Sequence, residues 1–202
     1  MSRFRTLLPW LLTALIVLVV AGSVLLLSDE RQEAAIGTAG ASETLGGDFT
    51  LQSSGGPVSL EDFRGQVVLL YFGFVNCPEV CPASMAVYRR ALGQLTAAEQ
   101  QQVQPLLVTI DPERDSLAEI DAFVDYFNSN IIGLSGELTE VRTVAAQYGA
   151  FFEKADAEDS ELGYVFDHVS RYYVIDQNGV LVDAMRHSTT ANELRARIRS
   201  LL

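Results

Sequence analysis

Residues 66–82 of the chain read QVVLLYFGFVNCPEVCP. The run over residues 66–74 is almost continuously apolar, as is typical of a strand that is buried on both faces of a sheet. Cys77 and Cys81 follow this run; they are the only cysteines among 202 residues, and a proline follows each of them. A helix is predicted over about residues 82–95, because a proline is tolerated in the first turn of a helix. Cys81 is expected in the turn before this helix, since a proline disfavours the helical conformation of the residue that precedes it.

The patterns on either side of this stretch predict an alternation of strands and helices. Further strands are predicted over residues 48–52, 58–60, 106–110, 131–134, 171–176 and 180–184, and further helices over residues 116–127, 137–148 and 192–202. Ser116 and Glu119 form the pattern of a capping box, and Asn178-Gly179 is a strong hairpin signal. This order predicts an α/β fold in which helices flank a mixed sheet. The cysteines would lie at the carboxyl end of a central strand, where open α/β sheets place their sites.

The segment over residues 7–27 is uncharged along its 21 residues. At about 1.5 Å rise per residue, a helix of this length spans the hydrocarbon core of a bilayer, which is about 30 Å thick. Arg3 and Arg5 precede the segment and acidic residues follow it, so the positive-inside rule predicts that the rest of the chain is exported. A cleaved signal peptide is the alternative, but its apolar region normally has about 7–15 residues before an A-x-A-like site. We therefore expect a retained, single-pass transmembrane helix.

The expected organisation has three parts. Residues 1–28 form a cytoplasmic tip and the membrane anchor. Residues 29–47 are rich in Ala, Gly, Ser, Thr and Glu, which is typical of a flexible linker. Residues 48–202 form the globular domain. This organisation predicts a protein of the inner (cytoplasmic) membrane, with its domain on the periplasmic side.

The charge of the exported part limits its partners. All 26 acidic residues lie beyond the anchor, together with 12 basic residues, which gives a formal charge of −14. Such a charge repels phosphates, so we expect no nucleic-acid partner. It suits a basic protein or a cation, although acidic surfaces also simply keep exported domains soluble. The acidic segment over residues 153–161 is interpreted as a solvated loop, with docking of a basic partner as the alternative.

The spacing of the two cysteines limits their chemistry. Disulfides persist in exported domains, but a bond across three intervening residues removes little chain entropy, so the pair is expected to be chemical rather than structural. The spacing is not that of thioredoxin-type enzymes, and two cysteines do not make a four-ligand zinc site. Two soft sulfurs and one further ligand suit a soft monovalent ion, and copper is the first candidate. The adjacent helix N-terminus favours thiolates, which primes the pair for metal binding or for disulfide formation.

A third ligand must come from a distant part of the chain. His168 precedes the predicted strand over residues 171–176, and in a thioredoxin-like sheet the loop that enters this strand faces the cysteine loop. We therefore expect His168 to complete the site, although a lone histidine is more often an ordinary, partly buried residue. The other histidine, His187, is expected on the surface. Asp111 ends the neighbouring strand; it could orient a ligand, accept a proton from a departing thiol, or hold its own loop with Arg114.

Several motifs, in this order and spacing, resemble those of the Sco/SenC family. They are GQVVLLYFGF at residues 65–74, CPEVCP at residues 77–82, TIDPERD at residues 109–115, IGLSG at residues 132–136, and Asp167-His168. The resemblance runs over about residues 49–202 and implies a thioredoxin-like fold. It also implies that Cys77, Cys81 and His168 are copper ligands, and that Asp111 corresponds to an acidic position close to the metal.

The resemblance further implies a function. Members of this family are membrane-tethered copper proteins that help to assemble the dinuclear copper centre of cytochrome c oxidase. The chain is thus expected to bind one copper ion, as Cu(I) or Cu(II), and to deliver it to the copper-binding subunit of the oxidase. Another copper chaperone or a thiol reductant would be a further partner. The chain departs from the family at Asn76, where many members carry histidine, and at Val169, where a small polar residue is commoner; both departures concern the tuning of the site.

An enzyme is the alternative interpretation. The cysteine pair could cycle to a disulfide and reduce the cysteines of the oxidase subunit, as in a thiol–disulfide oxidoreductase. Thioredoxins, however, place a cis-proline opposite their cysteines, and no proline follows Pro112 in this chain. The spacing of three intervening residues also argues against this activity. We therefore expect a metal-binding protein rather than an enzyme.

Overall fold

The computed structural model describes residues 45–128, 130–157 and 163–202. The predicted transmembrane helix and most of the predicted linker lie outside these ranges. Within them, no helix is long and apolar enough to cross a membrane. The residues from Leu45 to Leu202 form one compact unit.

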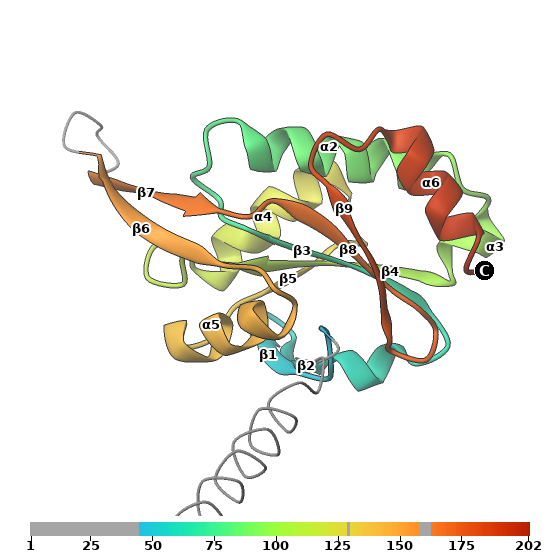
Figure 1. The fold of residues 1–202 in the computed structure, drawn as a ribbon, viewed down its shortest axis with the longest axis horizontal. Coiled ribbons are helices and arrows are strands. Elements are labelled where there is room, and N and C mark those ends of the chain that lie inside the picture. Colours follow the sequence, from blue (N-terminus) through green and yellow to red (C-terminus); the bar gives the residue numbers. More distant parts are fainter. Residues whose placement is uncertain (1–44, 129, 158–162) are drawn as a thin grey trace, which may run out of the picture. The chain divides into compact units, whose positions relative to one another are not determined.

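The core of this unit is a five-stranded sheet with the strand order β5-β4-β3-β8-β9 (Figure 1). Its strands are β3 (Val67–Gly73), β4 (Val103–Thr109), β5 (Ile132–Leu134), β8 (Arg171–Ile175) and β9 (Leu181–Arg186). The strands β3, β4 and β5 are parallel, whereas β8 runs antiparallel to both β3 and β9. The register pairs Gly73 of β3 with Thr109 of β4, so these two strands end side by side. The prediction of a mixed α/β sheet is thus confirmed.

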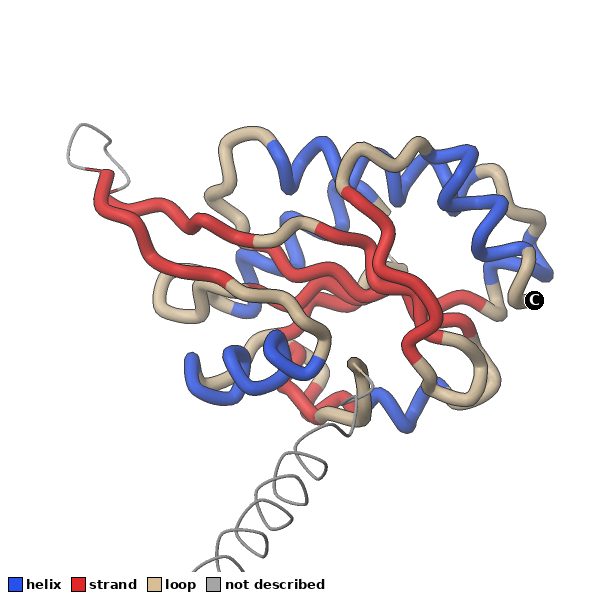
Figure 2. Tube along the Cα trace, viewed as in Figure 1, coloured by secondary structure: helices blue, strands red, loops and turns tan. Residues whose placement is uncertain are grey.

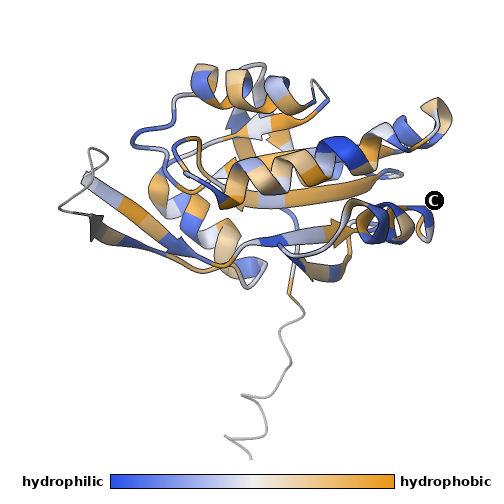
Figure 3. Cartoon of the chain, turned by 90° about the horizontal axis from the view of Figure 1, so that it is seen from above, coloured by the Kyte–Doolittle hydropathy of each residue, from blue (hydrophilic) through white to orange (hydrophobic). Residues whose placement is uncertain are grey.

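Strand β3 lies at the centre of this sheet. All seven of its residues are buried, and Leu69 and Leu70 have no exposed surface. A central strand covered on both faces needs apolar side chains in both directions, which explains why the sequence shows a continuous run instead of an alternation. In Figure 3 the central strands carry mostly the hydrophobic colour, whereas the helices carry both colours.

Helices and a hairpin cover the two faces of the sheet. The helices are α2 (Val80–Gly93), α3 (Ala97–Gln100), α4 (Leu117–Phe127), α5 (Leu138–Gln147), α6 (Ala191–Arg199) and the short 3-10 helix η1 (Leu60–Phe63). Helix α2 packs against both α4 and α6. On the other side of the sheet lie α5 and the hairpin of β1 (Thr50–Ser53) and β2 (Gly56–Ser59), as Figure 1 shows. Ser116 caps α4 by accepting a hydrogen bond from the N–H of Glu119, which confirms the predicted capping box.

A separate two-stranded ribbon, formed by β6 (Phe152–Ala157) and β7 (Gly163–His168), runs beyond the central sheet (Figure 2). The prediction of a solvated loop is wrong for residues 153–157, because they lie in β6. Likewise His168 is the last residue of β7 and not part of a loop, and it pairs with Phe152. The two strands pair through their backbones while several side chains of β6 stay exposed, so apolar periodicity gives no signal for this ribbon.

Helix α2 begins earlier than predicted. It starts at Val80, so that Cys81 lies in its first turn, and the expectation of Cys81 in a preceding turn is wrong. Pro82 occupies the third helical position, where a backbone N–H would have no partner within the helix. The N–H of Cys81, which also has no partner within the helix, donates to the sulfur of Cys77 at 3.4 Å. This bond offsets the preference of a residue before proline for an extended conformation.

Shortening a buried side chain of β3 should destabilise the domain. Replacing Leu70 with alanine leaves a cavity between the two covered faces and should lower the free energy of unfolding by about 2–5 kcal/mol, as measured by urea denaturation. Val180, which is 55% exposed, provides the control. Val180→Ala should change the stability by less than about 0.5 kcal/mol. Equal effects of the two substitutions would contradict the central position of β3.

Candidate metal centre

Three side chains from separate segments meet at the carboxyl end of β3. The sulfurs of Cys77 and Cys81 and a ring nitrogen of His168 all lie within 4.8 Å of one another. No disulfide joins the two cysteines. Among the described residues this is the one group of three or more histidine, cysteine, aspartate or glutamate side chains that could hold a metal ion. The expected convergence of these three residues is therefore seen in the structure.

The N-terminal end of helix α2 lies next to the sulfur of Cys77. A turn after β3, in which the N–H of Cys77 donates to the carbonyl of Phe74, brings the sulfur below the first turn of the helix. Glu79 is the N-cap residue, and its side chain makes no capping hydrogen bond. The backbone N–H groups at this end are therefore available to the sulfur, and they favour a negative charge on it.

The two thiols differ strongly in acidity. A hydrogen bond with the Cys81 thiol, together with hydrogen bonds from His168 and from the N–H groups of Cys81 and Glu79, lowers the pKa of Cys77 to about 4 despite its burial. The hydrogen bond with Cys77 and complete burial raise the pKa of Cys81. The pair therefore shares one proton at neutral pH, with the negative charge on Cys77 and the proton on Cys81. The sulfur of Cys77 can thus bind a metal ion as a thiolate, whereas Cys81 must first lose its proton.

The imidazole of His168 forms the exposed side of the site. Its ring packs edge-on against Phe74, with the centroids 5.8 Å apart, and the hydroxyl of Ser170 lies 3.3 Å from its Nδ1. His168 is partly exposed, whereas Cys81 is fully buried and Cys77 nearly so. A cavity of about 380 Å³, lined among others by Phe74, Cys77 and His168, opens in front of them. Cys77 and His168 thus line the same cavity, whereas Cys81 is not part of its lining.

Asp111 is engaged in the loop that follows β4. Its side chain is buried, Arg114 Nε donates to its Oδ2, and the hydroxyl of Tyr164 donates to its Oδ1 at 2.9 Å. Of the roles open to Asp111 from the sequence, the structure thus shows the one in which it holds its own loop with Arg114. Its carboxylate is not part of the group formed by the two sulfurs and the imidazole.

Two residues of the site were not predicted. Asp115 is buried, and its Oδ2 accepts hydrogen bonds from the N–H of Val75 at 2.9 Å and from the hydroxyl of Thr109 at 2.6 Å, which ties the cysteine loop to the end of β4. Gly73 ends β3, and a Cβ atom there would lie 2.9 Å from the sulfur of Cys81. A glycine inside a strand pattern often marks such a close approach, so the sequence did contain a signal for this position.

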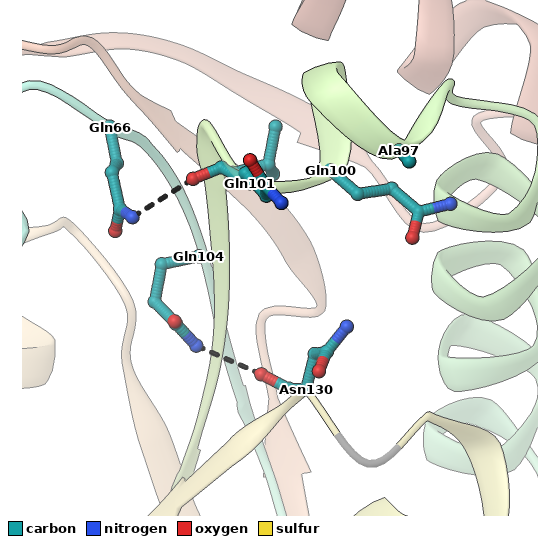
Figure 4. Close-up of a pocket in the computed structure, with 7 residues that line it drawn as sticks. Gln66, Ala97, Gln100, Gln101, Gln104 and Asn130 are labelled. Carbon is teal, nitrogen blue, oxygen red and sulfur yellow. Dashed lines mark hydrogen bonds between the residues drawn. The ribbon is translucent and has the colours of Figure 1, made fainter.

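The other histidine lies away from this group. His187 is exposed in the loop after β9, as expected. A second pocket, of about 530 Å³, lies at the opposite, amino ends of β3 and β4 (Figure 4). It is lined mainly by the amide side chains of Gln66, Gln100, Gln101, Gln104 and Asn130. Amides without a thiol, imidazole or carboxylate do not form a site for a soft metal ion.

Comparison with known proteins gives one consistent result. The family model described as SCO1/SenC matches residues 37–202. The chain is 34% identical to the mitochondrial SCO2 homolog of Bos taurus over 155 residues, which cover 76% of this chain and 58% of that protein. It is 30% identical to the mitochondrial SCO2 protein of Saccharomyces cerevisiae over 191 residues, which cover 91% of this chain and 64% of that protein. The match thus spans less than two thirds of the length of these curated relatives.

Solved structures with the same fold include metal-free and copper-bound proteins. The apo Sco1 protein of Thermus thermophilus is 34% identical, with a TM-score of 0.72 over 78% of this chain and 92% of that chain. Yeast Sco1 with copper bound is 30% identical, with a TM-score of 0.70 over 78% and 87% of the two chains. Bradyrhizobium japonicum ScoI with copper bound is 28% identical, with a TM-score of 0.70 over 78% and 99%. The thioredoxin-like Sco fold is therefore established for the described part of the chain.

The acidity of the pair can be measured by alkylation. In the metal-free protein, iodoacetamide should modify Cys77 and spare Cys81 at pH 6, because Cys77 is already a thiolate there. The rate should rise as the pH passes about 4 and stay nearly constant up to pH 7. Mass spectrometry of peptides identifies the modified residue. A rate that grows by about tenfold per pH unit between pH 5 and pH 8 would show an ordinary thiol and contradict the assignment.

Gly73→Ala tests the close packing at the end of β3. The added methyl group must displace the sulfur of Cys81, which weakens the hydrogen bond that contributes most to the low pKa of Cys77. The pKa of Cys77 should therefore rise in the same alkylation assay, and overpacking should lower the stability by about 1–3 kcal/mol. The control is Gly93→Ala at the end of α2, where a Cβ meets nothing within 4 Å. The alkylation profile of this control should match that of the unmodified protein.

Proposed function

The chain belongs to the SCO1/SenC family, and on this premise we propose that it is a membrane-tethered copper chaperone. It binds one copper ion through Cys77, Cys81 and His168 and delivers the ion to cytochrome c oxidase during assembly of the oxidase copper centre. The observation that carries the proposal is the meeting of two sulfurs and one imidazole nitrogen within 4.8 Å. Copper is the ion found in the solved relatives from yeast and Bradyrhizobium japonicum.

The donor set suits copper better than the commoner hard ions. Thiolates and imidazole are soft or intermediate ligands, whereas magnesium and calcium prefer oxygen donors. A structural zinc site would normally use four protein ligands, and this group offers three. The thiolate of Cys77 is available without a prior deprotonation, and Cys81 releases its proton when the ion binds. Loading with copper is thus coupled to the release of one proton.

The burial of the ligands supports a route for transfer by ligand exchange. A recipient that approaches through the cavity meets His168 and Cys77, of which His168 is the more exposed, whereas Cys81 is fully buried. Incoming thiols of the recipient therefore displace His168 first and one cysteine second.

Phe151 and Val169, both exposed, lie close to His168 in the chain or across the ribbon and offer apolar contacts to a docked protein. The formal charge of −14 on the exported part suits a recipient with a basic surface.

The tether follows from the N-terminal sequence. In this proposal residues 1–28 provide the cytoplasmic tip and the transmembrane anchor, residues 29–47 the flexible linker, and residues 48–202 the copper-binding domain. Arg3 and Arg5 orient the anchor so that the domain lies on the periplasmic side of the inner membrane. Attachment to the same membrane raises the effective concentration of the chaperone near a membrane-embedded recipient.

The second candidate function is a thiol–disulfide oxidoreductase that reduces the cysteines of the copper-binding subunit. The observation in its favour is the low pKa of Cys77 next to the thiol of Cys81, which is the arrangement of an attacking and a resolving cysteine. The absence of a cis peptide bond from the described residues leaves this candidate without the cis-proline of thioredoxins. Both functions use the same two sulfurs, so an experiment must separate them.

Substitution of the ligands tests the copper site. Cys77→Ala and Cys81→Ala should each weaken copper binding by more than about 100-fold, since even the partners that only orient a ligand contribute about 10–100-fold. His168→Ala should remove the nitrogen neighbour of copper and retain the two sulfurs, as counted by X-ray absorption. His187→Ala is the matched control and should change nothing. A His168→Ala protein with full Cu(II) affinity and an unchanged absorption spectrum would refute the proposed ligands.

Transfer and reduction can be distinguished with the isolated copper-binding subunit of the oxidase. The copper-loaded protein should transfer its ion to the reduced subunit in a one-to-one ratio, as followed by the absorption of the acceptor site. In a parallel reaction, the metal-free protein is mixed with the disulfide form of the subunit and excess chelator. Repeated turnover in the presence of an external thiol reductant, without transfer of copper in the first reaction, would favour the oxidoreductase over the chaperone.

A further inference from the structure

We propose that the loop over residues 111–115, called here the bridging loop, holds the imidazole of His168 in register with the two sulfurs. Arg114 and Tyr164 are the positioning residues of this arrangement. The inference rests on the proposed function in one respect, namely that His168 is taken as a metal ligand. It goes further by naming residues outside the group of candidate ligands that set the ligand geometry.

His168 needs an external constraint because its strand is not part of the central sheet. Within the described residues, β7 pairs with β6, whereas the cysteines follow β3 of the five-stranded sheet. Among the described residues no ladder joins β7 directly to β3, so the position of His168 relative to the sulfurs depends on the connection through β8 and on side-chain contacts. The chain from His168 enters β8 after Val169 and Ser170, which anchors only one end of the ribbon. Figure 2 shows the two strands of the ribbon running away from the sheet.

One face of β7 points toward the site and the bridging loop. Residues two apart in a strand lie on the same face, so Tyr164, Phe166 and His168 form one row. Phe166 packs edge-on against Phe74, with the centroids 5.6 Å apart, and His168 packs against the same ring at 5.8 Å. Tyr164 continues the row at 5.7 Å from Phe166. A shift of Tyr164 along the strand direction would therefore be passed to His168 through this stack.

Tyr164 is held from several directions at once. The guanidinium of Arg114 lies 3.6 Å from the centre of its ring, and the ammonium of Lys154 lies 3.9 Å from the centre. Its hydroxyl donates to Asp111 at 2.9 Å, and Arg114 Nη1 donates to its backbone carbonyl at 3.1 Å. Two cations on one aromatic ring and a charge-assisted hydrogen bond leave the side chain little freedom. Lys154 also pairs with Glu113 at 2.8 Å, so both strands of the ribbon are tied to the bridging loop.

The same loop also holds the cysteine segment. Asp115, its last residue, accepts the hydrogen bond from the N–H of Val75, which lies two residues before Cys77. The Asp115 carboxylate is in turn fixed by Thr109 at the end of β4. Within these five consecutive residues, Asp115 contacts the segment with the sulfurs, and Asp111 and Arg114 contact the strand with the imidazole. The bridging loop is therefore a second connection between the two halves of the site, in addition to the direct packing of Phe74 against Phe166 and His168.

A purely structural role would stabilise the domain without controlling His168, and a matched pair of substitutions separates the two roles. Arg114 binds one carboxylate and the carbonyl of Tyr164. Arg197 binds the carboxylate of Asp183 at 3.0 Å and the carbonyl of Val182 at 3.1 Å, between α6 and β9. Arg114→Gln and Arg197→Gln therefore each remove a contact to a carboxylate and a contact to a backbone carbonyl. Arg114 contacts the ribbon, whereas Arg197 joins α6 to β9.

The experiment uses the full chain with isotopically labelled histidine rings, of which there are two. In the metal-free protein, the His168 ring should show nuclear Overhauser contacts to Phe74, and the exposed His187 serves as an internal reference. Arg114→Gln and Tyr164→Ala should weaken or abolish these contacts and leave the His187 signal unchanged. Tyr164→Phe, which keeps the ring between the two cations, should retain most of the contact. Arg197→Gln should retain all of it, even where its melting temperature falls.

Loading with copper provides the second measurement. With Cu(II), the nitrogen hyperfine coupling in the electron paramagnetic resonance spectrum should be lost in Tyr164→Ala and Arg114→Gln, as in His168→Ala, and the copper affinity should fall by about 10–100-fold. The proposal is overturned if both variants keep the His168–Phe74 contact and the nitrogen coupling while they lose as much stability as Arg197→Gln. If Tyr164→Ala does not fold, Arg114→Gln decides. If the unmodified protein shows no nitrogen coupling, the ligand assignment fails, and the metal-free ring contacts still test the bridging loop.

Discussion

The burial of β3 on both faces determines where the chain can emerge from the sheet as the cysteine-bearing turn. Leu69 and Leu70 have no solvent contact, so a slip of the strand by one residue would exchange its two covered faces and disturb every neighbour. Since Gly73 pairs with Thr109, the turn after β3 and the bridging loop after β4 start from adjacent points. Helix α2 begins three residues after Cys77, so the Cys81 thiol in its first turn, with smaller contributions from His168 and the backbone N–H groups of Cys81 and Glu79, lowers the pKa of Cys77.

The elements of the central sheet could be predicted from the sequence because their signals are local. The apolar run of β3, the capping box of Ser116 and Glu119, and the Asn178-Gly179 turn each occupy a few consecutive residues. The convergence of Cys77, Cys81 and His168 was also expected, since the order of strands in a thioredoxin-like sheet brings the corresponding segments together. Topology thus carries much of the information about a site whose ligands are 91 residues apart.

The features that the sequence did not reveal depend on contacts between distant residues. The ribbon of β6 and β7 is stabilised by Lys154 and Arg114 around the ring of Tyr164, and a lysine within an acidic segment gives no strand signal. The placement of Cys81 in α2 depends on the hydrogen bond that its N–H donates to the sulfur of Cys77. Helix propensities of single residues do not include such a bond. Asp115 was not singled out because a buried carboxylate becomes recognisable only when its donors, Val75 and Thr109, are brought to it.

The unequal exposure of the three candidate ligands has a consequence for the order of events. Cys77 and His168 line one cavity, whereas Cys81 is fully buried. Under the proposed function, a reductant of the thiols, a donor of the ion and an acceptor of the ion would each reach Cys77 and His168 through this cavity. These proteins would therefore compete for one binding site and bind one after another. An excess of any one of them would inhibit the step that each of the others carries out.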